Sequence, residues 1–339
     1  MEILKNYSLK NHNTFGIDAK ADFYVSIRNN EEIEELINTS LFQNDKFFIL
    51  GGGSNVLFTG NFKGLIIDIN IRGIKILETN DDKITIEVGA GEHWDDLVTI
   101  CLNNKFFGLE NLALIPGKVG AAPVQNIGAY AVEQKDFFYS LTGYNIEKKQ
   151  FETLNYDDCK FNYRDSVFKH ELKNNFIITQ VRYKLNKNEN INLSYKELSQ
   201  EISKFNIEKP DAKLIYDTVR RLRTHKLPDY RLLGNAGSFF KNPIISKGKF
   251  DKLKEIFTEL QGYTLANNKV KVSAGWLIEQ CGWKGRQIGK AGVSEKHALI
   301  IVNHGNAKGH DILNLSEQIK QSIIDKYDIE LENEVLIIE

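Results

Sequence analysis

The chain has 339 residues, of which 44 are basic and 45 acidic, and its formal net charge is −1. This balance excludes a protein that binds nucleic acid or an anionic membrane through a globally basic surface. The length excludes a disulfide-stapled mini-protein and predicts about two domains, each large enough for its own core. The hydrophobic fraction of 42% argues against disorder.

The first residues lack the apolar stretch of a secretory signal, and no segment has the apolar length that spanning a membrane requires. We therefore expect a cytoplasmic protein that binds neither membrane nor nucleic acid. The three cysteines, Cys101, Cys159 and Cys281, are scattered and lack Cys-x-x-Cys spacing. They are predicted to be buried free thiols, and no disulfide or metal site is expected.

Strand and helix patterns alternate in the first half of the chain. Asn29 and Asn30 are candidate caps of a short helix that turns Ile33, Leu36 and Ile37 inward. The other elements predicted here are strands over residues 47–50, 65–69 and 83–88, and an amphipathic helix over 94–102. This mixture indicates an α+β arrangement.

The second half continues the mixture. Residues 209–226 concentrate Arg and Lys and mark a soft domain boundary. The predicted elements are a strand over 175–185, helices over 250–260, 277–281 and 312–323, a strand over 298–302, and a terminal strand over 334–339.

A glycine-rich turn, Gly51-Gly52-Gly53-Ser54-Asn55, directly follows the predicted strand over 47–50. Because glycines lack Cβ atoms, this backbone can direct several N–H groups at one phosphate, with the Ser and Asn side chains as further donors. It is not a dinucleotide-binding fingerprint, since residues 56–60 are too short and glycine-terminated to form the helix that such a motif opens. A plain glycine turn between strands is the alternative.

A second unusual segment runs from Leu114 to Tyr130 and combines small residues, two prolines and the amide pair Gln125-Asn126. Its glycines allow close approach, so its backbone can wrap a flat ligand with a polar edge, such as an isoalloxazine ring. A tight crossover between domains is the alternative.

Ser238 stands between the small residues 235–237 and the aromatic pair Phe239-Phe240. The Gly-x-Ser-x-Gly pattern of a hydrolase is absent. Oriented by cations and amides, such a hydroxyl can give a proton to a carbanion. A serine that caps a turn is the alternative.

Charged residues supply the last candidates. Arg164 lies in an aromatic setting, next to Tyr163. A basic cluster of Arg220, Arg221, Arg223, His225 and Lys226 suits a diphosphate, or is simply a solvated helix face. Glu334 is a single acid within the predicted apolar terminal strand, where the alternative to a functional role is an edge residue that prevents aggregation.

Together and in this order, the motifs resemble the MurB-type UDP-N-acetylenolpyruvoylglucosamine reductases of bacterial cell-wall synthesis. The resemblance spans nearly the whole chain. The segments that carry it are Asn13-Thr14-Phe15-Gly16, residues 51–57, Gly108-Leu109-Glu110-Asn111-Leu112, Ile115-Pro116-Gly117, residues 123–130, Tyr163-Arg164-Asp165-Ser166, Leu227-Pro228-Asp229, residues 234–243, residues 274–280 and Glu334-Val335.

The resemblance implies an FAD-binding fold of the vanillyl-alcohol-oxidase type, made of two α+β subdomains, together with a C-terminal α+β substrate-binding domain. On this basis the FAD-binding domain is expected at residues 1–218, with subdomains near 1–70 and 71–218. The substrate-binding domain is expected at 219–325, and residues 326–339 are expected to form a terminal strand that returns toward the flavin.

The resemblance also implies that NADPH reduces a non-covalent FAD, which then reduces the enolpyruvyl group of UDP-N-acetylglucosamine-enolpyruvate to give UDP-N-acetylmuramate. By motif position, Ser238 is the proton donor, while Arg164 and Glu334 stabilise the negative charge that develops. Desolvation in an apolar strand would favour the neutral form of the Glu334 carboxyl group.

Further site residues follow from the same resemblance. Flavin contacts are expected from Gly51, Gly52, Gly53, Ser54, Asn55, Pro116, Gly117, Gly120, Ala121, Gln125, Asn126, Ile127 and Gly128. Substrate contacts are expected from Tyr130, Tyr195, Arg223, Lys226, Asn242 and His297. The loop with Tyr195 is typical of the longer, type I enzymes, and the partners implied are a small-molecule substrate and NADPH, with the protein a monomer.

Three residues depart from the pattern of the family. Lys118 stands where a smaller residue is expected, His297 where Gln is common, and Leu336 where a basic residue commonly follows Glu-Val. Two alternative functions are another flavin oxidoreductase of the same superfold and a non-catalytic nucleotide-binding protein that uses the basic cluster.

Overall fold

The computed structural model describes residues 1–339, and the chain divides into two compact units. Unit 1 comprises Met1–Tyr7, Ala21–Gly52 and Lys63–Arg223. Unit 2 comprises Ser8–Lys20, Gly53–Phe62 and Thr224–Glu339. Each unit mixes helices and strands, which confirms the predicted α+β class.

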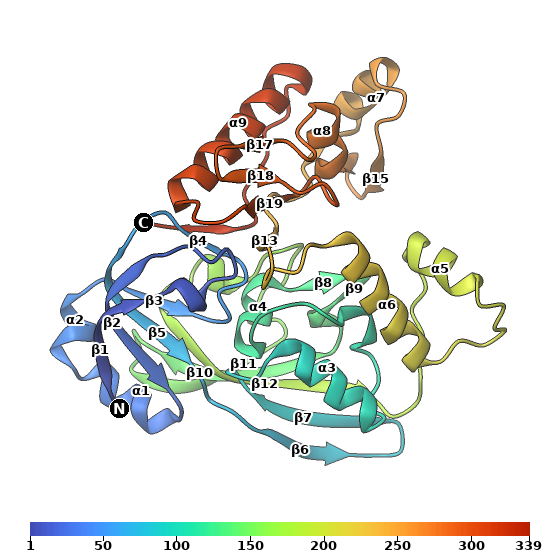
Figure 1. Ribbon diagram of the computed structural model, residues 1–339. Helices are drawn as coiled ribbons and strands as arrows, with labels where there is room; N and C mark the ends of the chain where they lie inside the picture. Colours follow the sequence, from blue (N-terminus) through green and yellow to red (C-terminus); the bar gives the residue numbers. More distant parts are fainter. The chain divides into compact units, whose positions relative to one another are not determined.

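The first sheet of unit 1 has the strand order β1-β2-β5-β3 (Figure 1). Its edge strand β3 pairs in parallel with β5, with Leu50 opposite Asp68 at the carboxyl ends. Asn29 caps the helix that follows β2, as predicted, by accepting a hydrogen bond from the Glu32 N–H. The elements are β1 (Ile3–Ser8), β2 (Lys20–Ile27), α1 (Asn30–Ile37), α2 (Ser40–Asn44), β3 (Phe47–Leu50) and β5 (Phe62–Ile69).

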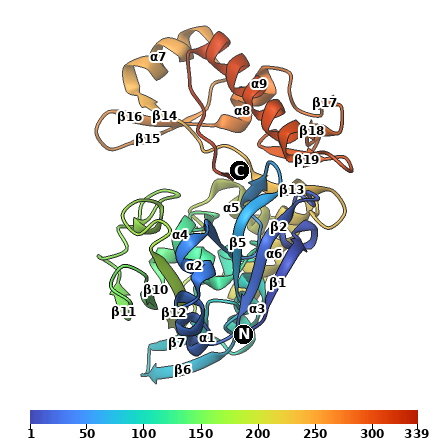
Figure 2. The same ribbon diagram turned by 90° about the vertical axis from the view of Figure 1, so that its left-hand side faces the viewer.

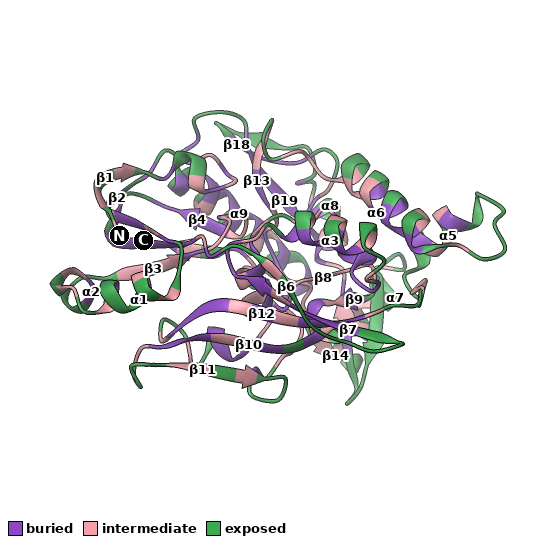
Figure 3. Cartoon of the chain, turned by 90° about the horizontal axis from the view of Figure 1, so that it is seen from below, coloured by how far each residue is buried: buried purple, intermediate pink, exposed green.

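The second sheet of unit 1 has the order β11-β10-β12-β7-β6 and is antiparallel throughout. Figure 3 shows long buried stretches on β7, β10 and β12. Helix α3 turns the predicted stripe of Trp94, Leu97, Val98 and Cys101 inward. The elements are β6 (Ile74–Thr79), β7 (Lys83–Gly89), α3 (Trp94–Asn103), β10 (Phe138–Asn145), β11 (Gln150–Asn155) and β12 (Phe176–Asn186).

One hydrophobic cluster joins the two sheets of unit 1, with Val25 and Leu65 from the first and Ile86 and Val181 from the second. Burial of these apolar side chains is the main stabilising contribution. The remaining elements of the unit are α4 (Ala122–Gln125), β8 (Gly128–Ala129), β9 (Val132–Glu133), α5 (Lys196–Ser203) and α6 (Ala212–Lys226), whose last turn belongs to unit 2.

Unit 2 contains three small sheets. Two have the orders β13-β19-β18-β17 and β14-β16-β15 (Figure 2), and the third is the pair β20-β4. Helix α9 packs against β18 and β19 through its apolar stripe. The elements are β4 (Val56–Phe58), β13 (Gly234–Ser238), β14 (Ile244–Ser246), α7 (Lys247–Ile256), β15 (Gly262–Leu265), β16 (Lys269–Val272), α8 (Ala274–Gln280), β17 (Gln287–Ile288), β18 (Ala291–Val293), β19 (Ile300–Asn303), α9 (Gly309–Tyr327) and β20 (Leu336–Ile338).

Single 3-10 turns complete the structure, at Lys10–His12, Glu110–Leu112, Val119–Ala121, Gln134–Asp136 and Val167–Lys169. None of the helices combines the length and the apolar character that crossing a bilayer requires.

Three expectations are corrected here. Helix α7 ends at Ile256, so Phe257 and Leu260 lie beyond it. Cys101 and Cys159 are buried free thiols, but Cys281 is only half-buried. The terminal strand begins at Leu336, so Glu334 lies in a bend before the strand rather than within it.

Candidate active site

The turn after β3 brings two backbones into direct contact in unit 1. A Cβ atom on Gly52 would lie 2.7 Å from the Cα of Gly117, and one on Gly51 would lie 3.0 Å from the Cβ of Ala121. No side chain fits between the turn and the segment that contains Gly117. The glycines therefore permit a close approach between these two stretches of backbone.

The second half of the same turn belongs to unit 2. Gly53 has φ +64° and would place a Cβ only 2.0 Å from the carbonyl oxygen of His12. The Asn55 side chain donates a hydrogen bond of 3.0 Å to the Glu334 carbonyl, and the Asn55 carbonyl accepts one from the Leu336 N–H. Asn55 thus ties the glycine turn to the chain terminus.

The glycine- and proline-containing segment runs beside the end of β7 and the start of α3. The N–H groups of Val119 and Gly120 donate to the carbonyls of Glu92 and Ala90 at 2.8 and 2.9 Å, and Trp94 donates to the Gly117 carbonyl at 3.0 Å. These hydrogen bonds hold the backbone of the segment against residues 90–94.

The amide pair at the end of this segment is engaged within the protein. The Gln125 side chain accepts a hydrogen bond of 2.7 Å from Lys169. Asn126 is fully buried, has φ +42°, and donates to the Asn162 carbonyl at 2.9 Å. Both side chains therefore support the turn that carries Arg164.

Arg164 occupies the tip of a tight turn between Asn162 and Asp165. Its φ of +52° is uncommon for a residue with a side chain and is a strained conformation of the kind that recurs at functional sites. The guanidinium donates to the Gly128 carbonyl at 2.6 Å. It lies 3.8 Å from a carboxylate oxygen of Glu133. The guanidinium group is therefore held against the backbone of the glycine- and proline-containing segment, residues 114–130, which we call the ligand segment.

Tyr130, Tyr195 and Arg223 form a second group in unit 1. The two tyrosine rings meet edge to face, with centroids 5.2 Å apart. Burial raises the pKa of the Tyr130 phenol to about 12, and the nearby Arg223 opposes this shift. Burial also lowers the pKa of the Arg223 guanidinium, and its Nε is buried without a hydrogen-bond partner. A buried N–H donor of this kind suits an anionic ligand.

The basic cluster around Arg223 does not act as one patch. Arg220 forms a bidentate ion pair with Asp95, at 2.6 and 2.7 Å, and Arg221 pairs with Glu201 at 3.2 Å. Arg220 and Arg221 each pair with a carboxylate of the protein, whereas the Nε of Arg223 has no hydrogen-bond partner.

Ser238 closes strand β13 in unit 2. The ladder between β13 and β19 is irregular between Asn235 and Ser238, where Gly237 adopts φ +69°. The buried Asn235 side chain accepts a hydrogen bond of 3.0 Å from the Gly237 N–H and thereby holds this irregularity. Such an irregularity re-aims the side chains of a strand, here that of Ser238.

Glu334 lies next to this strand end through the main chain. Its N–H donates to the Phe239 carbonyl at 2.8 Å, and Phe240 and Asn333 form an isolated bridge. The chain terminus then continues as β20, which pairs in parallel with β4. Unit 2 therefore places Ser238 and Glu334 on neighbouring backbones.

The other predicted substrate residues of unit 2 have structural contacts. Asn242 accepts a hydrogen bond of 3.0 Å from the N–H of Ala274 at the start of α8. The Nδ1 of His297 accepts one of 3.2 Å from the Leu299 N–H, which leaves Nε2 to carry the proton in the neutral ring. Lys226 is half-buried at the end of α6.

Three positioning residues were missed from the sequence. Asn111 donates to the carbonyls of Tyr130 and Asn192, Lys169 donates to the Arg164 carbonyl at 2.8 Å, and Asp95 pairs with Arg220. The only signal was for Asn111, which lies in the motif Gly108-Leu109-Glu110-Asn111-Leu112. Lys169 and Asp95 are charged residues that the sequence does not distinguish from residues on a solvent-exposed surface.

Comparisons with known proteins identify the family of the chain. Residues 21–146 match an FAD binding domain family, and residues 228–338 match the family described as UDP-N-acetylenolpyruvoylglucosamine reductase, C-terminal domain. The chain is 47% identical over 339 residues to the UDP-N-acetylenolpyruvoylglucosamine reductase of Flavobacterium johnsoniae, covering 100% of both chains. It is 41% identical over 335 residues to that of Bacteroides fragilis, covering 98% of both.

The fold agrees as well. The crystal structure of the reductase from Thermus caldophilus superposes with a TM-score of 0.66 at 24% identity, covering 100% of this chain and 98% of that one. The predicted combination of an FAD-binding domain with a C-terminal domain of this reductase family is confirmed. The chain belongs to the UDP-N-acetylenolpyruvoylglucosamine reductase family.

Proposed function

We propose that this protein uses NADPH and non-covalent FAD to reduce the enolpyruvyl group of UDP-N-acetylglucosamine-enolpyruvate, which yields UDP-N-acetylmuramate for peptidoglycan synthesis. The observation that carries the proposal is the full-length similarity to reductases of this name, at 47% identity, in a chain that has the glycine-lined segments and Ser238 beside Glu334.

The residues of unit 1 fit a flavin. Backbone from Gly51-Gly52 and from residues 117–121 meets so closely that any Cβ on either glycine would clash or crowd. Peptide N–H and C=O groups, rather than side chains, therefore face whatever binds along these segments. When bound, FAD supplies the redox chemistry, taking a hydride from NADPH and delivering it to the terminal methylene carbon of the substrate.

The protein's own residues would then manage the charge and the proton. Hydride addition to the methylene leaves negative charge on the adjacent carbon and its carboxylate. We assign the Oγ of Ser238 as the donor of the proton to that carbon, and Arg164 as a permanent positive charge that stabilises the carboxylate. We assign Glu334 to the same charge, because its backbone is hydrogen-bonded beside Ser238.

The second group of unit 1 would bind the nucleotide part of the substrate. Tyr130 and Tyr195 offer aromatic faces and hydroxyl groups, and the cationic Arg223 beside Tyr130 suits a diphosphate. Lys226, Asn242 and His297 are proposed as further substrate contacts from unit 2. We also propose that the protein is a cytoplasmic monomer, which light scattering on the purified holoprotein tests.

The test begins with the purified protein. Denaturation should release FAD, and the holoprotein should oxidise NADPH in an amount equal to the UDP-N-acetylmuramate formed. NADPH oxidation that does not depend on the enolpyruvyl substrate, or a protein that takes up no FAD when it is supplied, would contradict the proposal.

A further inference from the structure

Lys118 is a buried cation in the middle of the glycine- and proline-containing segment of unit 1. Its side chain is 8% exposed, which is rare for lysine. The ammonium group donates to the Asp68 carboxylate at 2.5 Å, to the Ile69 carbonyl at 2.9 Å and to the Asn70 side chain at 2.8 Å. All three donors of the ammonium group are thus satisfied.

The three acceptors lie at the carboxyl end of β5, in the first sheet. The backbone of Lys118 instead belongs to the segment that is hydrogen-bonded to residues 90–94, which directly follow β7 of the second sheet. Lys118 therefore connects the ligand segment to the other sheet by a single side chain.

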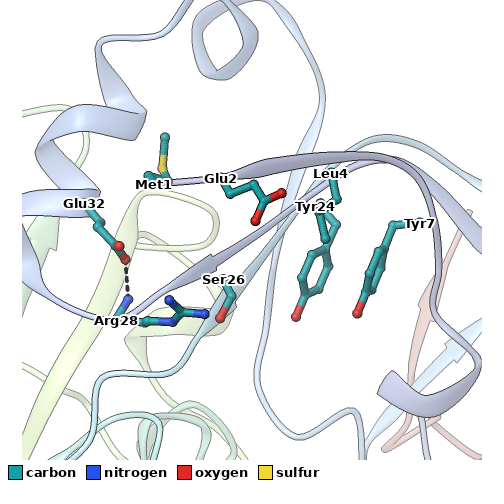
Figure 4. Close-up of a pocket in the computed structure, with 8 residues that line it drawn as sticks. All are labelled: Met1, Glu2, Leu4, Tyr7, Tyr24, Ser26, Arg28 and Glu32. Atoms are coloured by element: carbon teal, nitrogen blue, oxygen red, sulfur yellow. Dashed lines mark hydrogen bonds between the residues drawn. The ribbon is translucent and has the colours of Figure 1, made fainter.

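Asp68 is held in place from the opposite side. Its second carboxylate oxygen accepts hydrogen bonds from the Tyr24 hydroxyl at 2.8 Å and from the Asn70 amide at 2.7 Å. Figure 4 shows Tyr24 and Tyr7 with their rings side by side among the residues that line a pocket, and the ring centroids are 4.0 Å apart. The acceptor of the Lys118 ammonium group is thus rigidly oriented.

Asp68 also lies close to the glycine turn. It is opposite Leu50 in the parallel pair of β3 and β5, and Leu50 is followed directly by Gly51 and Gly52. The neighbouring Gly117 is the residue that a Cβ on Gly52 would strike. The ion pair therefore lies beside the contact that sets the spacing between the two glycine-lined backbones.

Net stability does not account for this arrangement. A buried ion pair contributes little over an apolar pair of similar volume, because desolvation of both charges offsets their attraction. The pair instead fixes the position of the segment relative to the end of β5, because the ammonium group can reach all three acceptors in only one position of the segment.

We propose that Lys118, together with Asp68, is a positioning residue for the flavin: it holds residues 117–121 at the spacing from Gly51-Gly52 that FAD requires. This inference rests on the proposed function, because it takes FAD as the ligand of these segments. It also explains why a lysine is accommodated at a position where a smaller residue was expected.

The test compares a paired variant with a matched control. Lys118→Met with Asp68→Asn removes both charges, so that neither is left buried alone. Arg182→Met with Glu87→Gln removes another partly buried ion pair of unit 1, at 2.6 Å between β12 and β7. The dissociation constant of FAD is measured by flavin fluorescence on each apoprotein, and the free energy of unfolding by denaturant titration.

The Lys118/Asp68 variant should bind FAD about tenfold more weakly, as expected when a binding segment is no longer preorganised. The fine structure of the visible absorption band of its bound flavin should change, while its free energy of unfolding stays near that of the wild type. The Arg182/Glu87 variant should bind FAD within about twofold of the wild type.

Equal FAD affinity in the Lys118/Asp68 variant, or an equal loss in the control, would overturn the inference. A wild-type protein that binds no FAD would instead contradict the proposed function itself. If the paired variant does not fold, Asn70→Ala removes one acceptor of the Lys118 ammonium group and should weaken FAD binding in the same direction. Unchanged affinity of Asn70→Ala would then overturn the inference.

Discussion

The two units hold their proposed functional residues by different means. In unit 1, Arg164, Tyr130 and the ligand segment are held by buried side chains, namely Asn126, Asn111 and Lys118. In unit 2, Ser238 and Glu334 are held mainly by the main chain, through pairing with β19 and through the Phe239 carbonyl. Side-chain contacts can be removed one at a time, whereas a main-chain arrangement changes only when the backbone itself is disturbed.

This contrast predicts that glycine changes have the largest effect in unit 2. Gly53→Ala should lower the free energy of unfolding by about 3 kcal/mol, because the new Cβ would meet the His12 carbonyl and the residue has a positive φ. Denaturant titration measures this. Gly60→Ala is the matched control in the same unit, since no atom lies within 4 Å of its Cβ position. Equal effects of the two changes would refute the backbone argument.

In unit 1, the largest effect is expected from a buried amide. Asn126→Ala should cost about 2 kcal/mol of stability, because it removes the side-chain hydrogen bonds of a fully buried amide, among them the one to the Asn162 carbonyl. It should also slow substrate reduction, since the turn that carries Arg164 loses its support.

The control for this change is Asn174→Ala. Asn174 is exposed and also has a positive φ, of +57°, so its replacement reports the backbone cost alone. A stability loss for Asn126→Ala no greater than that for Asn174→Ala would show that the buried hydrogen bonds contribute nothing.

A smaller, pH-dependent effect is expected at Glu110, a buried carboxyl group of unit 1. Burial raises its pKa, and two hydrogen bonds from the Gly108 N–H oppose the shift. The folded state therefore holds this proton more tightly than the unfolded chain. Its contribution to stability is greatest below the ordinary glutamate pKa of about 4.3 and is lost as the pH rises through the folded pKa.

Glu110→Gln removes this titration and keeps an acceptor for Gly108. The free energy of unfolding of the variant, relative to the wild type, should increase from about pH 4, near the ordinary glutamate pKa, to about pH 7. Denaturant titrations at several pH values measure the difference. A difference that stays constant across this range would show that the carboxyl group is not destabilised by burial.

Much of the fold was predictable because local patterns match it. The strand over 47–50, the alternating strand over 83–88 and the helix that begins at Trp94 all lie where the periodicity placed them. Each has an apolar face that packs into one core, which makes the pattern visible in the sequence.

What could not be predicted depends on contacts between distant parts of the chain. One example is the pairing of β20 with β4, with Glu334 in the bend before β20. The hydrogen bond from Thr59 to the Ile338 carbonyl in this pair joins residues 279 positions apart. Lys118 was recognised as unusual, but its partner Asp68 lies 50 positions earlier and carries no motif. The sequence likewise identified Arg223 but could not show that Arg220 and Arg221 are already paired.

The central claim is that Ser238 gives the proton to the substrate carbon, and rapid mixing of Ser238→Ala tests it most directly. Ser246→Ala, an exposed serine that caps α7 in the same unit, is the control. Reduction of the bound flavin by NADPH should keep its wild-type rate in both variants. Reoxidation by the enolpyruvyl substrate should slow by about 10²- to 10⁴-fold in Ser238→Ala alone, as expected for loss of a general acid. Equal slowing of both half-reactions, or an unchanged second half-reaction, would contradict the account.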